Sequence, residues 1–329
     1  MRFSVIVPVY NRPDEVEELL ASLSLQTYKN FEVIIVEDGS SVPCGDVVAR
    51  YESALEVHYF TKANSGPGPT RNYGAERCSG DYLLFLDSDC VVPQAWLEEV
   101  VRELVAAPVD AFGGPDRADK SFTDIQKAIN YSMTSFFTTG GIRGGKKRLD
   151  KFYPRSFNLG VSRSAFTALE GFAAMRFGED IDLSLRIYKA GYTCRLFPEA
   201  WVYHKRRTDV KKFFKQVYNS GMARISLWKK HPGSLKAVHL LPAAFVLGVC
   251  ALVLLSIVHY AFIFPVIFYA ILVFADSALK NRSLRIGLLS IITAFVQLFA
   301  YGCGFIVAFW KGIILKQSGL TAFEKTFYK

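Results

Sequence analysis

The strongest constraint on the fold comes from two long apolar segments near the C-terminus. Between residues 238 and 275 the only strongly polar side chains are two histidines, and residues 286–310 include no charged side chain. Segments of this length are typical of membrane-spanning helices, and the first is long enough for two helices with a turn near His259. The sequence therefore predicts membrane-spanning segments at about 238–258, 259–277 and 286–310.

A buried helix pair in a soluble protein is the alternative for these segments. Aromatic residues at their edges, Tyr260, Tyr301 and Trp310, favour a membrane interface instead. The number of crossings stays open at this point. Three crossings would place the lysine-containing tail 316–329 outside, against the positive-inside tendency, whereas an even number requires a re-entrant or in-plane final segment.

Positive charge is concentrated just before these segments. Ten Lys or Arg residues and one acidic residue, Asp209, lie between Lys205 and Lys236, a local balance of +9 that equals the charge of the whole chain. Such a segment favours anionic lipid headgroups and the cytosolic side of a membrane. No nucleic-acid-binding signature accompanies it, so we expect no nucleic-acid partner.

The N-terminal sequence and the cysteines predict that the N-terminal domain lies in the cytosol. The opening apolar run reaches Pro8 without a longer hydrophobic region or a cleavage site, so we expect no cleavable targeting segment. The six cysteines show no C-x-x-C pairing, which predicts neither a zinc site nor a disulfide framework and agrees with a reducing compartment.

Residues before the basic segment follow an α/β pattern. The β-branched run from Phe3 to Tyr10 reads as a buried parallel strand, and Pro13 suits the first position of the helix that follows. Further buried strands are expected at 31–36 and 82–86. Strand, helix and strand at this spacing form a βαβ unit, which predicts a mostly parallel sheet. The predicted apolar face of the helix consists of Val16, Leu19, Leu20 and Leu23.

Acidic turns end two of these strands. Asp87 and Asp89 follow the strand at 82–86, and Asp38 follows the strand at 31–36. Because ligands collect at the carboxyl ends of strands in open α/β sheets, we expect one polar site there. The carboxylates of Asp87 and Asp89 can converge on one hard divalent cation together with a diphosphate.

Two further segments add candidate polar groups. The run from Asn64 to Gly74 has glycines and prolines followed by Arg71, which can reach a phosphate or be a plain surface arginine. Gly178-Glu179-Asp180 precedes a helical pattern in which Asp182 and Arg186 are spaced for an i,i+4 ion pair. Helix-dipole stabilisation alone would explain acids at this position. A carboxylate at this position can also act as a general base that takes a proton from an attacking hydroxyl group.

These motifs together resemble family 2 glycosyltransferases with the GT-A fold. The resemblance covers about residues 1–205 and rests on five motifs in the family order. They are Ser4-Val5-Ile6-Val7-Pro8-Val9-Tyr10-Asn11, Val36-Glu37-Asp38-Gly39-Ser40, the stretch from Asn64 to Gly74, Asp87-Ser88-Asp89 and Gly178-Glu179-Asp180.

The resemblance implies a role for each matching residue. Asp38 would contact the nucleotide base or ribose, and Asp180 would be the catalytic base. The donor-binding residues would be Pro8, Tyr10, Asp38, Asn64, Arg71, Asp87, Ser88 and Asp89, with Asp87 and Asp89 holding Mg²⁺ or Mn²⁺. The acceptor side would include Asn158, Glu179, His204 and Arg206.

We therefore interpret the chain as an inverting glycosyltransferase that moves one sugar from a nucleoside-diphosphate sugar to a lipid-linked or glycan acceptor at the membrane. Processive members of the family have a Gln-x-x-Arg-Trp motif, whereas here Gln216, Arg224 and Trp228 are more widely spaced, which favours transfer of a single sugar. The alternatives are a polyprenyl-phosphate sugar synthase, a nucleotidyltransferase and a non-catalytic membrane scaffold. A nucleotidyltransferase would need a Gly-rich, Lys-bearing loop after the first strand, which the sequence lacks.

The predicted organisation has a GT-A domain, Rossmann-like with flanking helices, followed by transmembrane helices. The glycine-rich basic patch 140–148 is expected to be a loop that either closes over a substrate or stays a plain connection. A multi-pass cell-membrane protein with a cytosolic catalytic domain is the expected arrangement. The predicted boundaries are 1–204 for the catalytic domain, 205–237 for the basic juxtamembrane segment, 238–315 for the transmembrane region and 316–329 for the tail.

Overall fold

The computed structural model of the chain describes residues 1–117, 122–140, 152–205 and 207–320. These residues belong to two compact units. An α/β unit comprises 1–117 and 152–205, and a helical unit comprises 122–140 and 207–320. Residues 122–140 lie inside the catalytic domain predicted from the sequence but pack with the C-terminal helices, so the two units interleave along the chain. The domain boundaries given above stay predictions.

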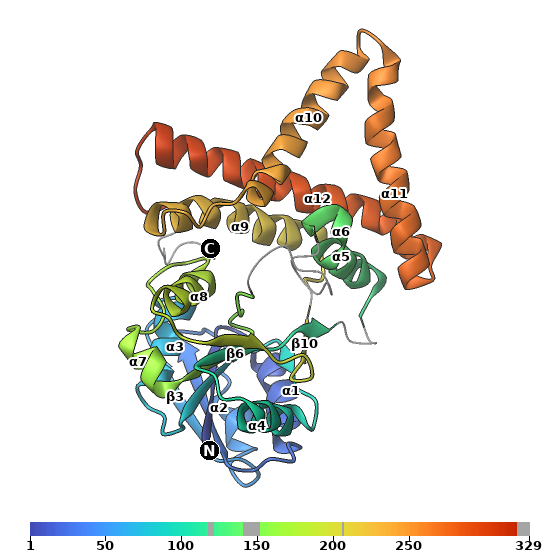
Figure 1. Cartoon of the computed structure of the whole chain (residues 1–329). Helices are drawn as coiled ribbons and strands as arrows, with labels where there is room; N and C mark the ends of the chain where they lie inside the picture. The colour runs from blue at the N-terminus through green and yellow to red at the C-terminus, as the bar shows by residue number, and fades with distance from the viewer. Residues whose placement is uncertain (118–121, 141–151, 206, 321–329) are drawn as a thin grey trace. The chain divides into compact units, whose positions relative to one another are not determined.

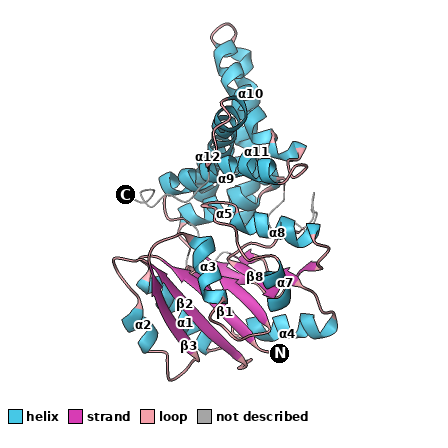
Figure 2. Ribbon diagram, turned by 90° about the vertical axis from the view of Figure 1, so that its left-hand side faces the viewer, coloured by secondary structure: helices cyan, strands magenta, loops and turns pink. Residues whose placement is uncertain are grey.

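The α/β unit is built on a seven-stranded mixed sheet with the order β3-β2-β1-β4-β8-β6-β9 (Figure 2). Strands β1 to β4 run parallel to one another where they pair, whereas β8 is antiparallel to both β4 and β6. The strands are β1 (Phe3–Val9), β2 (Phe31–Asp38), β3 (Val57–Lys62), β4 (Tyr82–Leu86), β6 (Ala111–Gly113), β8 (Asn158–Ser162) and β9 (Cys194–Leu196). The predicted mostly parallel sheet with flanking helices is confirmed.

Alternation along the strands gives this sheet two apolar faces. Successive side chains of a strand point to opposite faces, so Val5 and Val7 lie in one core while Ile6 lies in the other. Helices α1, α2 and α4 contribute to the first core, and α3, α7 and α8 contribute to the second. Their bounds are α1 (Pro13–Ser24), α2 (Gly45–Ala49), α3 (Pro67–Ala75), α4 (Trp96–Ala106), α7 (Arg163–Ala168) and α8 (Glu179–Lys189).

The first βαβ unit forms as predicted. Helix α1 begins at Pro13, whose missing N–H costs nothing at a helix start. Its buried face includes the four predicted residues, Val16, Leu19, Leu20 and Leu23. Parallel pairing of β1 with β2 and with β4 brings the ends of these strands to one edge of the sheet.

A small second sheet extends this edge. It has the order β5-β10-β7, from Cys90–Val91, Val202–His204 and Asp116–Arg117. Residue His204 pairs with Cys90 across the antiparallel β5–β10 ladder. The chain directly after the Asp87-Ser88-Asp89 turn is therefore joined to a strand more than a hundred residues later.

The helical unit contains one long amphipathic helix and three apolar helices (Figure 1). Helix α9 (Val210–Lys230) runs beside α12 (Leu284–Phe309), and α10 (Leu241–Ser256) and α11 (Phe264–Asn281) form a hairpin. The shorter elements are α5 (Asp124–Thr134), α6 (Phe136–Thr139), the 3₁₀ turns Ala237–His239 and Tyr260–Ile263, and the π-helical turn Trp310–Ile314. Helix α5 starts with a capping box in which Thr123 and Gln126 bond to each other's backbone N–H groups.

Two continuous helical stretches in the described part of the chain are long and apolar enough to cross a membrane. They are Tyr260–Asn281 and Leu284–Ile314, with mean hydropathies of 2.2 and 2.0. Helix α10 is apolar but has only 16 residues. Helices thus occupy all three segments predicted to cross a membrane, and the first helix is the shortest of them.

Candidate functional site

The predicted nucleotide-contacting carboxylate, Asp38, holds the loop that leads into α3. Its Oδ1 accepts hydrogen bonds from Lys62 Nζ at 2.7 Å and from Ser65 N at 2.9 Å, and its Oδ2 accepts one from Gly66 N at 2.9 Å. The Asp38 side chain is buried, and Lys62 balances its charge. Sequence reasoning missed Lys62, although its place at the end of the strand beside β2 was a usable signal.

Three other predicted donor-side residues lie in this loop or at the end of β1. Asn64 donates from Nδ2 to the backbone oxygen of Asp38 at 2.7 Å. Pro8 and Tyr10 are half-buried at the end of β1. Directly after them, Asn11 has a φ of 55° and accepts hydrogen bonds from two backbone N–H groups of the turn that follows β2. The ends of β1 and β2 are therefore fastened to each other.

Arg71 joins two acidic motifs that lie far apart in the sequence. From α3, its Nη2 contacts Asp87 Oδ1 at 2.6 Å and its Nη1 contacts Glu179 Oε1 at 3.0 Å. The side chain is 4% exposed and lies over the ring of Phe172. Two carboxylates therefore bind the guanidinium group of Arg71, which the sequence analysis predicted could reach a phosphate.

Charges in this group are strongly coupled. Burial alone would lower the pKa of Arg71, but the carboxylates of Asp87 and Glu179 outweigh it and raise the pKa. Burial raises the pKa of Glu179, and the neighbouring charge of Asp180 raises it further, whereas Arg71 opposes both effects. Arg71 thus offsets the charge of the buried Glu179 and of the partly exposed Asp87.

Asp180 lies one residue further along α8 and points to a different partner. Its Oδ2 is 3.4 Å from Arg155 Nη1, and its Oδ1 accepts a hydrogen bond from the backbone of Ile181 at 2.8 Å. Its side chain is 15% exposed, compared with 9% for Glu179. Arg155 follows a segment that gave no motif in the sequence, so sequence reasoning missed it.

The predicted ion pair on α8 is present. Arg186 Nε donates to Asp182 Oδ2 at 2.9 Å, and Nη1 and Nη2 donate to the backbone oxygens of Leu169 and Gly171. Asp182 is fully buried in this arrangement. The pair therefore fastens α8 to the loop after α7, which gives Asp182 a structural explanation and separates it from Asp180.

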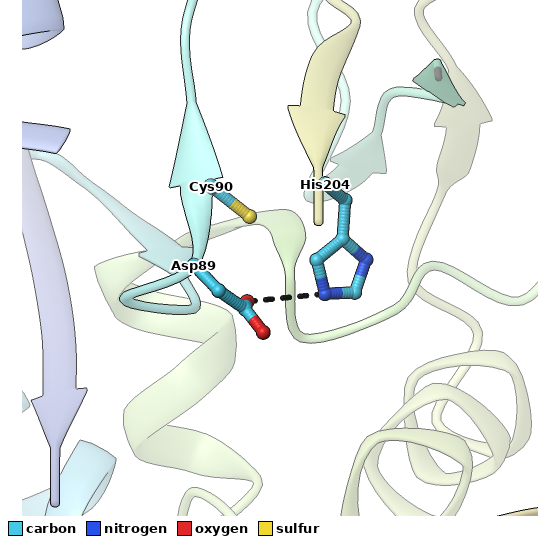
Figure 3. Close-up of side chains that lie close together, drawn as sticks. All are labelled: Asp89, Cys90 and His204. Carbon is cyan, nitrogen blue, oxygen red and sulfur yellow. Dashed lines mark ion pairs between the residues drawn. The ribbon is translucent and has the colours of Figure 1, made fainter. Parts of the chain in front are cut away.

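Asp89 forms a third polar group with His204 (Figure 3). Asp89 Oδ1 lies 3.2 Å from His204 Nε2, and Cys90 comes from the same turn as Asp89. One potential ligand atom from each of Asp89, Cys90 and His204 lies within 4.8 Å of the others. The imidazole also stacks on the ring of Phe157 with centroids 4.8 Å apart, which fixes its orientation.

The carboxylate of Asp89 suits a hard divalent cation of the Mg²⁺ or Mn²⁺ type, and the imidazole of His204 is a second potential ligand beside it. Asp89 supplies a carboxylate, His204 supplies an imidazole, and Asp87 lies two residues from Asp89. Burial raises the pKa of Cys90 well above its usual value, with the charges of Asp89 and Asp87 adding to the effect, so the thiol is a neutral neighbour. His204, which the sequence placed on the acceptor side, thus lies beside the predicted metal ligand.

The remaining predicted residues form no ion pair with the acidic motifs in the described part of the chain. Ser88 is buried between Asp87 and Asp89. Asn158 is buried on β8 and donates from Nδ2 to the backbone oxygen of Ala200 at 2.8 Å. It therefore joins two segments of the fold rather than facing an open space. Arg206 lies outside the described residues, and so does all of the glycine-rich patch beyond Gly140.

Comparisons with known proteins show the family of the chain. The family model described as "Glycosyl transferase family 2" matches residues 4–169, half of the chain. An uncharacterised glycosyltransferase of Rickettsia conorii is 42% identical over 88 residues, which are 27% of this chain and 15% of that protein. This chain therefore spans only a small part of that relative's length.

Two further likenesses extend over more of the chain. Glycosyltransferase AglE of Haloferax volcanii is 26% identical over 251 residues, covering 74% of this chain and 80% of AglE. The structure of mannosyltransferase PcManGT from Pyrobaculum calidifontis, in complex with GDP-Man and Mn²⁺, is similar with a TM-score of 0.65 at 18% identity. That similarity covers 91% of this chain and 86% of the other, and it confirms the predicted GT-A fold. The chain belongs to glycosyl transferase family 2.

Proposed function

We propose that the chain is an inverting glycosyltransferase that moves one sugar from a nucleoside-diphosphate sugar to an acceptor held at a membrane. The observation that carries this proposal is the bridge made by Arg71, which joins Asp87 to Glu179. A residue expected to hold the donor and the motif expected to supply the base are thereby held together through one buried arginine. Membership of family 2 supports the same activity class.

The donor side would use the edge where β1, β2 and β4 end. Asp38 and the loop it holds would contact the nucleoside, with Pro8 and Tyr10 beside them. Asp87 and Asp89 would face the diphosphate, and His204 joins them as a third candidate ligand because it lies against Asp89. A bound cation would neutralise the charge that develops on the departing diphosphate. The Mn²⁺ in the PcManGT complex supports such a requirement.

Asp180 would act as the general base. The acceptor hydroxyl oxygen would form a bond to the anomeric carbon while the bond from that carbon to the diphosphate oxygen breaks. Asp180 would take the hydroxyl proton, and the nucleoside diphosphate would leave with the electron pair. A single displacement of this kind inverts the anomeric carbon. Arg155, whose Nη1 lies 3.4 Å from Asp180 Oδ2, would hold the carboxylate in position.

The membrane location of the acceptor rests on the helical unit. Its apolar helices leave many large hydrophobic side chains exposed, among them Leu254, Ile257 and Val258. Helix α9 adds basic residues of the kind that attract anionic lipids. We therefore favour a lipid-linked acceptor at the cytosolic face of the membrane, and a sugar chain borne on lipid is the class we expect.

A polyprenyl-phosphate sugar synthase is the nearest rival. In that reaction the attacking atom is a phosphate oxygen, which is already deprotonated at neutral pH and needs no general base. A non-catalytic scaffold is the rival of another class, but it would have no use for three acidic motifs around one arginine.

A screen of nucleotide sugars with the full chain in lipid vesicles tests the proposal. We expect one donor to be hydrolysed slowly or to raise the melting temperature in the presence of Mn²⁺, and to transfer its sugar when a lipid-linked glycan is added. Product analysis should show an anomeric configuration opposite to that of the donor. Retention of configuration would rule out the inverting mechanism, and the absence of binding by any nucleotide sugar would favour the scaffold.

A further inference from the structure

Helix α9 has charged residues at both of its ends and one arginine in its middle turns. Five lysines are exposed on it: Lys211, Lys212, Lys215, Lys229 and Lys230. Gln216 and Arg224 occupy its middle turns, and a single arginine at the centre of a spanning helix costs about 2.5–3.5 kcal/mol even on insertion scales. Helix α9 is not among the candidate spans, and its charges suit a position at the membrane surface.

Helix α12 packs along α9, and the backbones of the two helices approach each other closely. A Cβ placed on Gly304 of α12 would lie 2.1 Å from the backbone oxygen of Tyr218, and one on Gly221 of α9 would lie 2.2 Å from that of Tyr301. Farther along, Lys229 Nζ donates to the backbone oxygen of Gly312 at 3.0 Å. Small residues that permit such an approach are typical of tightly associated helices. The two helices run side by side in the same direction (Figure 1).

The first half of α12 is attached to α5 instead. Thr293 Oγ1 donates to the backbone oxygen of Ala128 at 3.0 Å and lies 2.6 Å from Ser132 Oγ. At the start of α12, Arg285 is 3.3 Å from Asp124, the first residue of α5. Both halves of α12 are therefore bound to helices that carry charged residues, although α12 itself is apolar enough to span.

In contrast to α12, most of the α10–α11 hairpin is not covered by other helices. Helix α10 meets α12 near its own start, where Pro242 and Val246 surround Gly302. Its later residues and the hairpin tip are exposed, with Ile257 and Val258 at 81% and 83%. Only 11% of the spanning window in Tyr260–Asn281 is buried, compared with 44% of the window in Leu284–Ile314.

We propose that α12 lies in the plane of the membrane surface together with α9 and α5, and that the α10–α11 hairpin alone enters the lipid. If α12 crossed the bilayer, it would carry α5 or α9 into the hydrocarbon with it. The occupant of the exposed hairpin surface is the lipid bilayer, because the surface is apolar and the neighbouring α9 is basic. Both arms of the hairpin start and return on one side, so residues after α12 lie on the same side as the α/β unit.

Depth measurements test the position of α12 without relying on catalysis. The full chain is placed in phosphatidylcholine–phosphatidylglycerol vesicles, in a background that lacks the four cysteines that are not buried. Single probes are attached at exposed positions along α12 through Leu284→Cys, Leu288→Cys, Ile292→Cys and Phe309→Cys. We expect these four depths to agree within a few Å. A maximum depth at Ile292, with Leu284 and Phe309 at opposite surfaces, would overturn the proposal.

The hairpin provides the matched control. Probes at Ile267→Cys, Ile271→Cys and Leu279→Cys lie along exposed positions of α11. Twelve residues separate the first from the last, about 18 Å along the helix axis, so we expect a clear depth gradient from tip to base. Equal, shallow depths for all probes, or a chain that stays in solution beside the vesicles with its hairpin covered by a second copy, would contradict the assigned occupant.

Sidedness gives an independent measurement. In sealed vesicles, Lys316→Cys and Glu52→Cys, both at exposed positions, should react together with a membrane-impermeant maleimide or be protected together. Reaction of one without the other in a uniformly oriented preparation would mean an odd number of crossings and would refute the in-plane placement. Neither measurement depends on sugar transfer, so a failure here leaves the proposed function to be judged by its own test.

Discussion

The α/β unit and the helical unit bury different kinds of polar group. In the α/β unit, buried charged side chains contact opposite charges, as with Arg71, which contacts Glu179 and the partly exposed Asp87. In the helical unit, hydroxyl groups are buried between helices, as with Ser277 and Ser290, whose oxygens are 2.6 Å apart. Buried ions are costly unless paired, whereas buried hydroxyls need one partner each. The buried charges around Arg71 in the α/β unit belong to the proposed catalytic site, whereas the buried hydroxyl groups of the helical unit connect its helices.

The largest expected effect comes from Asp180→Asn, which keeps the shape of the side chain and removes the base. General acid–base catalysis is worth about 10²- to 10⁴-fold, so turnover should fall by at least that order at saturating donor and acceptor. Donor affinity should change little, because the base acts on the acceptor proton. Steady-state kinetics and donor titration measure the two effects separately.

Asp46→Asn, at an exposed position on α2, is the control and should behave like the unaltered chain. Near-normal turnover of Asp180→Asn would move the base assignment to Glu179. Loss of turnover with a hydroxyl acceptor, but not with a polyprenyl phosphate, would separate the two candidate reactions.

Removal of the metal should affect donor binding, whereas Asp180→Asn should affect turnover. Chelation with EDTA should abolish donor binding, and Mn²⁺ or Mg²⁺ should restore it. His204→Ala should weaken the apparent affinity for Mn²⁺ by at least the roughly 10- to 100-fold that changes around metal ligands typically cost. Calorimetric titration of Mn²⁺ in the presence of donor measures this. Unchanged metal affinity would return His204 to the acceptor side, where the sequence placed it, and tight donor binding in EDTA would contradict the metal site.

Loss of a buried charge should be the clearest test of stability in the α/β unit. Arg71→Ala leaves Asp87 and Glu179 without their shared cation, and breaking a buried ion pair typically costs about 3–5 kcal/mol. Adding Glu179→Gln should recover part of this loss, because the second change removes one uncompensated charge. Denaturant unfolding followed by a probe in the α/β unit measures both. If the double variant is no more stable than Arg71→Ala, electrostatic pairing with Glu179 is not what Arg71 contributes.

The smallest effect is expected in the helical unit. Ser277→Ala together with Ser290→Ala removes both partners of one hydroxyl pair, and hydrogen bonds between helices in membranes average about 0.6 kcal/mol. The melting temperature in vesicles should therefore shift only slightly. Gly304→Ala is the contrasting change, because its added methyl group would meet the backbone of α9. If the double serine variant lost as much stability as Arg71→Ala, buried hydroxyl pairs would be as important to stability as buried charges, and the contrast between the two units would be wrong.

Sequence periodicity determined the local elements of this protein. The alternating strands, the apolar face of α1, the ion pair between Asp182 and Arg186 and the three apolar helices all follow from residues close together in the chain. The order of the acidic motifs also allowed the family to be inferred. The roles of individual site residues remain predictions for the kinetic and binding measurements above.

Tertiary structure decided which distant residues meet. Nothing in the sequence around Arg71 indicates that its two partners come from Asp87 and Glu179, or that β10 carries His204 to Asp89. Nor does hydropathy distinguish α12 from α11, since both are apolar enough to span. Their neighbours differ, because α12 packs on helices with charged residues while most of α11 is left uncovered. Local patterns determine what a segment can become, but pairing between segments far apart in the chain depends on shape and charge that appear only once the chain has folded.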